Sequence, residues 1–445
     1  MASTAPGPDP RTGGTGGVGT PGTPRVLRAM NDRAALDLLL AHGPLSRPRI
    51  GRLTGLSKPT ASQLLARLEA AGLVEAMGMS EGRPGPNAQL YAVNPRAAYA
   101  AGLDVTADRI HAAVADVTGE IVGEFRLPAT PPGRGGVVRQ VAGALAGAAE
   151  KAGLTLGAVH RLVIGTPGAF DPATGRLRYA AHLPGWHSPT LLDELADALP
   201  MPVAYENDVN LVALAEQRTG AARGHEDFVL LWNETGLGAA LVLGGRLHRG
   251  ATGGAGEVGL MPVPGTPLVR RVAEAGAGGF QELAGVRPLL RLARDCGIET
   301  GPGSGSGIED GQGLGAGSGG PGDVPTDVPT DVPAVARLLA EAAARHTEHE
   351  PSARFLDGYA ERLAIGIAAL VAVLDPGLVV LAGAAVRPGG EPLRARVQEQ
   401  LAELSDAQPR LVLGTVERRP VLCGALVSAL AATRDEVFDT SRHPR

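Results

Sequence analysis

The sequence is poor in cysteine, in aromatic residues and in long hydrophobic runs, and each shortage excludes a class of protein. Two cysteines among 445 residues cannot form a disulfide framework or a cysteine-based zinc module. The longest apolar run, Leu363–Leu374, has 12 residues, fewer than the ~20 that cross a bilayer. The opening MASTAPGPDP lacks the apolar stretch of a secretion signal. We therefore expect a soluble, cytoplasmic protein without a membrane partner.

Glycine and proline are abundant, at 64 and 36 residues, and two stretches are almost free of large apolar side chains. Residues 1–24 cannot bury enough surface to offset chain entropy, and we expect a disordered tail. Residues 299–333 end in a DVPT-DVPT-DVP repeat and are interpreted as a disordered surface insertion within a folded domain. The remaining chain divides into residues 25–97 and residues 98–435.

Charge separates the same two regions. The chain carries a net charge of −5, but residues 25–96 carry ten basic and five acidic side chains, so that residues 97–445 carry about −10. A basic segment beside an acidic remainder is typical of a part that meets a polyanion. An imbalance of this size also arises by chance, so charge alone does not assign a function.

Residues 25–97 contain the pattern of a winged helix-turn-helix. The segment 31–43 has one apolar face, and Asn31 is expected to cap its start. Gly55 makes a tight turn between two further short helices, and Ser57 caps the second of them. A Gly- and Pro-rich hairpin and the strand LYAV follow, as in a β-wing.

The third of these helices presents short, amide and cationic side chains, which groove-reading helices offer to bases and phosphates. The candidate DNA-binding residues are Ser57, Lys58, Pro59, Thr60, Ser62, Gln63, Arg67 and, near the tip of the wing, Arg83. An arginine on a narrow loop can enter a minor groove. Double-stranded operator DNA is the expected partner. The alternative is a three-helix module that binds another protein.

Residues 98–435 alternate β-branched runs with Ala- and Leu-rich runs, a pattern typical of an α/β fold. The runs that predict strands are IHAAVADV, RLVIGTP, PVAYEND, FVLLWNE, AALVLGG and LVVLAG. Helices are predicted within residues 134–152, 188–198, 209–219, 334–347 and 353–374.

Several segments, in a fixed order, resemble the ROK family of sugar kinases and sugar-responsive repressors. They are GLDVTADRIHAAVADVTGEIV (102–122), VIGTPGAFDPATGRL (163–177), LPGW (183–186), PVAYENDVNLVALAE (202–216) and TGLGAALVLGGRLHRGATGGAGEVGL (235–260). The resemblance runs from about residue 28 to residue 437, apart from the insertion. It implies a two-lobed actin-like ATPase fold (sugar kinase or ribonuclease H-like) behind the DNA-binding unit of a repressor member.

The resemblance also implies a sugar site. Asp208 of the Glu-Asn-Asp segment matches the catalytic base of the kinases, and Asn207 lies beside it. Glu257 and Glu282 stand at the two glutamate positions that contact sugar in the family. Asn207, Asp208, Glu257 and Glu282 are therefore the candidate ligand-binding residues. Taken without the resemblance, an Asn-Asp pair before a helix is more simply a helix cap, and the four side chains can also line a cleft without any ligand.

The segments that bind phosphate in kinase members are altered here. The first loop, with Asp-x-Gly-Gly-Thr in the family, reads Asp104-Val105-Thr106-Ala107-Asp108, and both glycines are lost. In the second loop Glu234 replaces a glycine, so that two added carboxylates oppose a nucleotide phosphate. The sequence predicts no kinase activity, no catalytic residue and no cofactor.

The zinc ligands of the family are also replaced. Leu260 stands at the position of the histidine and Phe280 at that of the last cysteine. A structural zinc site needs about four nitrogen or sulfur ligands, so no metal is predicted.

These features predict a transcriptional regulator, most simply a repressor, that binds a palindromic operator as a homodimer or homotetramer. A sugar, preferably a neutral one, is the expected effector. Two alternatives stay open: an active ATP-dependent ROK sugar kinase, and a ligand-independent regulator whose body is only a dimerisation scaffold.

Overall fold

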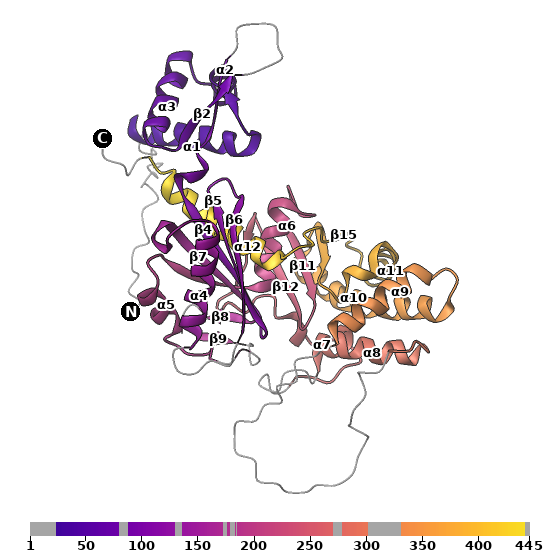
Figure 1. Cartoon of the computed structure of the whole chain (residues 1–445). Helices are drawn as coiled ribbons and strands as arrows, with labels where there is room; N and C mark the ends of the chain where they lie inside the picture. The colour runs from indigo at the N-terminus through magenta and orange to yellow at the C-terminus, as the bar shows by residue number, and fades with distance from the viewer. Residues whose placement is uncertain are drawn as a thin grey trace, which may run out of the picture. The chain divides into compact units, whose positions relative to one another are not determined.

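The computed structural model describes residues 24–79, 88–129, 136–171, 176–178, 183, 185–269, 278–300 and 331–440. The chain divides into two compact units (Figure 1). We call the first unit the head: it comprises the residues up to Asn94 together with those from Asp435 onward. The second unit, Pro95–Arg434, is the body.

Three helices form the core of the head. They are α1 (Pro24–His42), α2 (Arg47–Thr54) and α3 (Lys58–Ala70). The prediction that Asn31 caps the first helix is wrong, because α1 begins at Pro24 and runs through Asn31. Residues 25–30 contain no helix breaker, and a proline is well tolerated in the first turn of a helix. The buried side chains are Ala35, Leu36, Leu39, Ile50, Leu64, Leu65 and Leu68.

The turn between α2 and α3 is the one that the sequence predicts. Gly55 has a φ of 71°, in the left-handed region that glycine adopts without a steric cost, and its N–H donates to the carbonyl of Gly51. Ser57 then caps α3, because its side chain accepts a hydrogen bond from the N–H of Thr60.

A three-stranded antiparallel sheet completes the head. Its order is β1 (Leu45–Ser46), β3 (Gln89–Val93), β2 (Val74–Met79). The β2–β3 pair is the predicted wing. Its connection, residues 80–87, lies outside the described residues, and the candidate residue Arg83 lies there with it.

The body contains two five-stranded sheets that share one topology. The strand orders are β10-β7-β4-β5-β6 and β13-β12-β11-β14-β15. In each sheet the first strand in sequence pairs antiparallel with the second and parallel with the fourth. The first sheet consists of β4 (Tyr99–Val105), β5 (Arg109–Asp116), β6 (Ile121–Pro128), β7 (Val159–Thr166) and β10 (Val203–Asn207). The second consists of β11 (Phe228–Asn233), β12 (Leu237–Leu243), β13 (Arg246–Leu247), β14 (Leu378–Ala382) and β15 (Arg410–Leu413).

Helices cover both sheets and separate them (Figure 1). On one face of the first sheet lie α4 (Gly136–Lys151) and α5 (Leu191–Ala198). Between the two sheets lie α6 (Asp208–Thr219) and α12 (Pro420–Val437), which share one core with strands of both. The far face of the second sheet is covered by α7 (Gly279–Ala284), α8 (Val286–Asp295), α9 (Val332–Arg345), α10 (Glu350–Leu374) and α11 (Gly390–Leu404).

The close crossing of α6 and α12 depends on one glycine. A Cβ atom on Gly424 would lie 1.9 Å from the carbonyl oxygen of Leu211. No other residue type fits at that point, and the two central helices therefore hold the two lobes together at short range.

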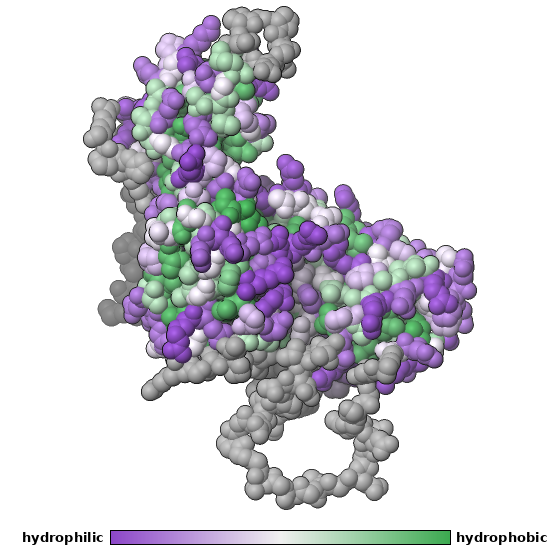
Figure 2. Space-filling view, in the orientation of Figure 1, coloured by the Kyte–Doolittle hydropathy of each residue, from purple (hydrophilic) through white to green (hydrophobic). Residues whose placement is uncertain are grey.

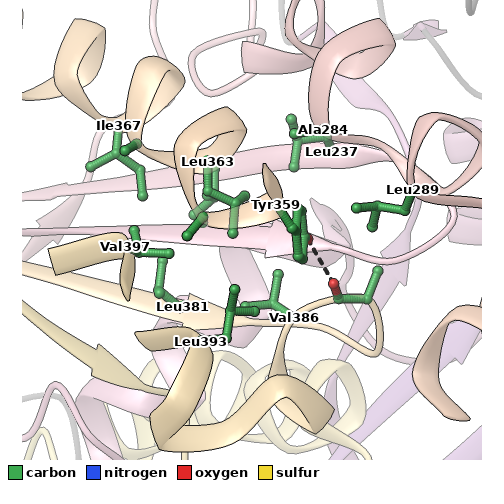
Figure 3. Close-up of a cluster of buried hydrophobic side chains, with 14 of the residues drawn as sticks. Leu237, Ala284, Leu289, Tyr359, Leu363, Ile367, Leu381, Val386, Leu393 and Val397 are labelled. Atoms are coloured by element: carbon green, nitrogen blue, oxygen red, sulfur yellow. Dashed lines mark hydrogen bonds between the residues drawn. The ribbon is translucent and has the colours of Figure 1, made fainter. Parts of the chain in front are cut away.

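Buried polar groups are hydrogen-bonded to one another in the core over the second sheet (Figure 3). The Tyr359 hydroxyl donates to the Ala385 carbonyl at 2.7 Å, and the Asn233 side chain donates to Tyr359 at 2.9 Å. These bonds tie the end of β11 to α10 and to the chain after β14.

Short elements complete the body. They are the hairpin β8 (Ala169–Asp171) and β9 (Arg176–Arg178), and the 3₁₀ turns η1 (Pro95–Ala97), η2 (Leu156–Ala158), η3 (Val258–Leu260) and η4 (Arg387–Gly389). The predicted insertion 299–333 falls mostly on residues 301–330, which lie outside the described residues, and α9 begins at Val332. Within the described part of the chain, no helix is long and apolar enough to span a bilayer.

Candidate functional site

The first turns of α3 form the candidate DNA-reading surface. Lys58, Pro59, Thr60 and Gln63 are exposed, and the Ser57 hydroxyl lies 2.8 Å from that of Thr60. On the side of the head that Figure 2 shows, hydrophilic and hydrophobic residues are interspersed. This turn therefore offers a cation, hydroxyls and an amide to a partner.

Two of the predicted DNA-binding residues are engaged within the head. The Ser62 hydroxyl donates to the Lys58 carbonyl at 2.9 Å, one helical turn earlier. The Arg67 guanidinium donates to the buried carboxylate of Asp32 on α1 at 2.6 Å. Arg67 is thus committed to the packing of α3 against α1, although 40% of its side chain remains exposed.

In the body, two of the four candidate ligand residues, Asn207 and Asp208, lie where β10 passes into α6. Asn207 is the N-cap of α6: its side-chain oxygen accepts from the N–H of Asn210 at 3.1 Å, and its amide nitrogen donates to the Gly168 carbonyl at 3.0 Å. Asp208 is the first residue of the helix, and its carboxylate accepts from its neighbour's N–H at 2.8 Å. Asn207 is therefore a helix cap in this structure, which is the simpler role expected of an Asn-Asp pair before a helix.

An ion pair between exposed Arg249 and buried Glu206 connects the Gly-rich loop after β13 (residues 248–257) to this site. Arg249 donates through two nitrogens to one oxygen of Glu206, at 2.8 and 2.6 Å, and the other oxygen of Glu206 accepts from Asn210 at 2.9 Å. Neither Arg249 nor Glu206 was among the residues that the sequence pattern singled out. Glu206 belongs to the Glu-Asn-Asp segment, but nothing in the sequence indicates its partner 43 positions away.

Four carboxylates from both lobes lie close enough to interact electrostatically. They belong to Asp104 and Asp208 of the first lobe and Glu234 and Glu257 of the second. Burial raises the pKa of Asp208 to about 7, and repulsion from the other three adds to the shift. Burial, with repulsion from Asp104, raises the pKa of Glu234 to about 7. Burial also raises the pKa of Asp104 and of Glu257. We call this group the carboxylate cluster.

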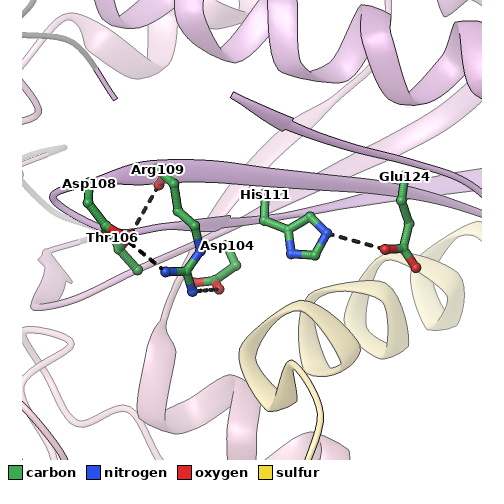
Figure 4. A network of polar contacts seen from close by, with 6 residues as sticks. All are labelled: Asp104, Thr106, Asp108, Arg109, His111 and Glu124. Carbon is green, nitrogen blue, oxygen red and sulfur yellow. Dashed lines mark hydrogen bonds and ion pairs between the residues drawn. The ribbon is translucent and has the colours of Figure 1, made fainter. Parts of the chain in front are cut away.

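Arg109 is the cation beside the cluster (Figure 4). Its guanidinium lies 3.8 Å from Asp104 and 3.5 Å from Asp108, and Thr106 donates to Asp108 at 2.5 Å. These contacts close the altered first loop on itself. Arg109, which the sequence analysis missed, is the positive charge that partly offsets the cluster, since its attraction lowers the pKa of both Asp104 and Glu234.

A second polar network lies on the same sheet (Figure 4). His111 is buried, and its Nε2 lies 3.3 Å from a Glu124 oxygen, while Glu124 also forms an ion pair with Arg419 before α12. Burial, together with repulsion from Arg126, lowers the pKa of His111. The network therefore joins the first sheet to the residue before α12 through the Glu124 carboxylate.

Glu282 is not among the residues that interact with the cluster. Its carboxylate forms an ion pair with Arg291 of α8. The neighbouring Gln281 instead points toward the second sheet, where its oxygen accepts from the N–H of Leu237 at 2.7 Å. The structure thus brings Asn207, Asp208 and Glu257 together and pairs Glu282 elsewhere.

An aromatic recess adjoins the ends of β7 and β10. The Tyr205 ring centroid lies 5.4 Å from that of Phe170 and 6.1 Å from that of Trp186, and Thr166 and Ser188 add hydroxyls to the lining. Among the described residues, no group pairs with the buried Tyr205 hydroxyl. Burial raises the pKa of this phenol.

The positions of the family's zinc ligands do not fit a metal. Leu260 offers no donor atom, and Phe280 is fully buried in the core over the second sheet, with its ring against Gly366. Residues 274–277 of the same segment lie outside the described residues. Within the described residues, no group of three His, Cys, Asp or Glu side chains is placed to hold a metal ion.

These features define a winged helix-turn-helix unit followed by a two-lobed body with an actin-like fold. Residues 100–282 match the ROK family and residues 30–77 the MarR family, so the body is similar to ROK proteins and the head to MarR-type winged helices.

Three known proteins show the extent of the similarity. The xylose repressor of Caldicellulosiruptor bescii is 28% identical over 235 residues, which are 53% of this chain and 59% of the repressor. The glucokinase of Thermotoga maritima is 40% identical over 106 residues, 24% of this chain and 33% of the kinase. The crystal structure of a ROK family transcriptional regulator, a homologue of the E. coli MLC protein, has a TM-score of 0.66 at 18% identity and covers 93% of this chain and 97% of its own. The matches span about three fifths of the length of the xylose repressors.

Proposed function

We propose that the protein is a sugar-responsive DNA-binding repressor that acts as a homo-oligomer. The observation that supports this most directly is the exposed first turn of α3, on a head similar to MarR-type winged helices, in a chain whose body is similar to ROK proteins. The xylose repressors among the relatives support the same combination of DNA binding and sugar response.

In this proposal α3 enters the major groove. Lys58 contacts a phosphate, and Gln63 reaches a base edge, where an amide pairs best with adenine. Arg83 of the wing approaches the neighbouring minor groove. Two heads related by a two-fold axis read the two halves of a palindromic operator.

The effector is a neutral sugar held by Asn207, Asp208 and Glu257. A carboxylate or an amide can form hydrogen bonds with two vicinal hydroxyl groups of a sugar at the same time. A phosphorylated sugar is disfavoured, because Asp108 and Glu234 add negative charge and, among the described residues, Arg109 is the cation that attracts Asp104 and Glu234. Glu282 stays a candidate that must leave Arg291 to reach a ligand.

Sugar kinase activity is the second candidate. The raised pKa of Asp208, about 7, suits a general base at neutral pH, and glucokinases are among the relatives. Against it stand the lost loop glycines and the carboxylates of Asp108 and Glu234 near the phosphate positions. We propose that no transfer occurs. A coupled ADP-release assay over a panel of hexoses, pentoses and N-acetylhexosamines tests this: turnover near 1 per second that Asp208→Asn abolishes would establish the kinase instead.

The DNA-binding proposal is tested by selecting bound sequences from random duplex DNA and measuring affinity by fluorescence anisotropy. We expect one palindromic motif, with Gln63→Ala changing the preferred base at one position of each half-site. The matched control is Arg139→Gln, which alters an exposed side chain on α4 of the body. Selection that yields no motif from the wild-type protein would refute the proposal.

A further inference from the structure

Asp32 is a buried carboxylate at the centre of the head. The residue is 3% exposed and lies on α1 one turn before the buried Ala35 and Leu36. Its Oδ1 accepts from the Arg67 guanidinium at 2.6 Å, and its Oδ2 accepts from the Thr440 hydroxyl at 3.0 Å. One side chain therefore joins the DNA-reading helix α3 to the C-terminal end of the chain.

The residues around Thr440 pack into the head as core. Phe438 is 1% exposed, and the Arg33 guanidinium lies 5.8 Å from the centre of its ring. The same guanidinium donates to Asp435 at 2.8 Å. Hence Asp435, Phe438 and Thr440 complete the head, although more than 340 residues separate them from Asn94.

The position of Arg67 gives this contact a role in reading DNA. Arg67 lies one helical turn after Gln63 on α3, so a fixed guanidinium fixes the rotation of the helix about its axis. A buried carboxylate that loses a partner is costly, which makes the Asp32 contact a strong constraint. Because the Thr440 hydroxyl donates to its second oxygen, the Asp32 carboxylate can adopt few other orientations.

We infer that Asp32 is a positioning residue for DNA recognition, and that the segment 435–440, here called the C-terminal clamp, is an integral part of the DNA-binding unit. The inference rests on the proposed DNA-binding function. In this view Arg67 acts through Asp32 and does not itself contact DNA.

The C-terminal clamp is a second covalent connection between the head and the body. It begins within the last turn of α12, whose earlier residues Leu422, Ala425 and Leu426 are buried in the core between the two sheets. The head is therefore covalently connected to the body at both of its ends, after Asn94 and before Asp435.

The test uses the full chain and three variants: Asp32→Asn, Thr440→Val and the double variant Asp32→Asn with Arg67→Gln. The matched control is Asp37→Asn, which removes an exposed carboxylate of α1 that pairs with Arg33. We expect Asp32→Asn to weaken operator binding about tenfold or more, and Thr440→Val a few-fold. Non-specific binding and its salt dependence stay unchanged, because no phosphate contact is lost. The double variant binds operator DNA no more weakly than Asp32→Asn alone, because both substitutions remove the same contact between Asp32 and Arg67. Asp37→Asn stays within about twofold.

Hydrogen exchange of the α3 amides gives a readout that does not depend on DNA. Faster exchange in Asp32→Asn, and in a chain ending at Arg434, supports the C-terminal clamp. Wild-type exchange rates in both variants, or unchanged operator affinity in folded Asp32→Asn, would overturn the inference. If the wild-type protein binds no DNA while exchange responds as expected, the proposed function fails and the packing role of the clamp stands.

Discussion

Replacing Asp208 by asparagine is expected to stabilise the protein, and to do so more as the pH rises. Asparagine keeps the size of the side chain and removes one charge from the carboxylate cluster. Burial and repulsion raise the pKa of Asp208 from 3.8 to about 7 in the folded protein. Between pH 3.8 and about pH 7, the Asp208 carboxyl is protonated in the folded protein and ionised in the unfolded chain. The native Asp208 therefore costs stability increasingly from about pH 4 to pH 7, and fully above pH 7.

The size of the effect follows from the same shift. One pKa unit corresponds to about 1.4 kcal/mol, so an isolated, fully buried carboxyl would cost ~4 kcal/mol at pH 8. Asp208 is half-buried and titrates together with Glu234, and we expect about 1–2 kcal/mol. For a body of about 340 residues the unfolding entropy is about 0.7 kcal/mol per kelvin, so the melting temperature rises by about 2 °C.

Differential scanning fluorimetry of the wild type and Asp208→Asn from pH 5 to pH 8.5 measures this. The difference in melting temperature should be about two fifths of its full size at pH 5, grow with pH, and level off above pH 7. Glu403→Gln, an exposed carboxylate on α11, serves as the control and should show no trend. A difference that is constant over this range, or a variant that is less stable at pH 8, would show that the carboxylate cluster does not strain the folded state.

Three further results are expected. Lys58→Ala should weaken binding to all DNA sequences about equally and lower the slope of log affinity against log salt by about 0.9, measured by anisotropy at several salt concentrations; an unchanged slope would show that Lys58 contacts no phosphate. Glu206→Gln should release Arg249 and destabilise the body by about 1–2 kcal/mol, with faster proteolytic cleavage of the Gly-rich loop; wild-type stability and cleavage would mean that the ion pair does not hold the loop. A sugar that binds beside the aromatic recess should change the tryptophan emission of the wild type and leave that of Trp186→Phe unchanged; a response that persists in the variant would place the ligand elsewhere.

The sequence predicted the local features of both units because these depend on residue types at short range. Gly55 makes the turn, because few residue types other than glycine adopt a left-handed φ. Ser57 makes the cap, because few residue types have a side chain that accepts a hydrogen bond at the N-cap. The alternation of strands and helices in the body was predictable for the same reason, because its buried strands appear in the sequence as short apolar runs. The start of α1 was placed too late, because a good cap at Asn31 does not stop a helix that has begun earlier.

Helix α12 was not predicted, for a physical reason. It lies between two sheets and is apolar nearly all round, so it lacks the single apolar stripe that identifies a surface helix. Its final residues belong to the head, and no short-range pattern in the sequence indicates that Thr440 bonds to Asp32, 408 positions away.

The candidate site was predicted in part. The resemblance to the ROK family named Asn207, Asp208 and Glu257 as candidates, and in the structure Asp208 lies beside Asn207 and close enough to Glu257 to interact with it. The partners that fix their surroundings were missed: Arg109 beside Asp104, and Arg249 on Glu206. These ion pairs join different strands and loops, and the charge pattern of the sequence does not distinguish them from solvated side chains.

Titration of the operator complex with sugars tests the central claim most directly. The wild-type protein is bound to its selected operator, and anisotropy is followed as xylose, glucose, N-acetylglucosamine and the corresponding phosphates are added to millimolar concentration. We predict that a neutral sugar lowers operator affinity by about tenfold or more, that its phosphate ester is weaker, and that Asp208→Asn binds operator normally but no longer responds. Operator affinity that no sugar changes would contradict the account and leave the body as a ligand-free scaffold. A response that Asp208→Asn retains would contradict the site.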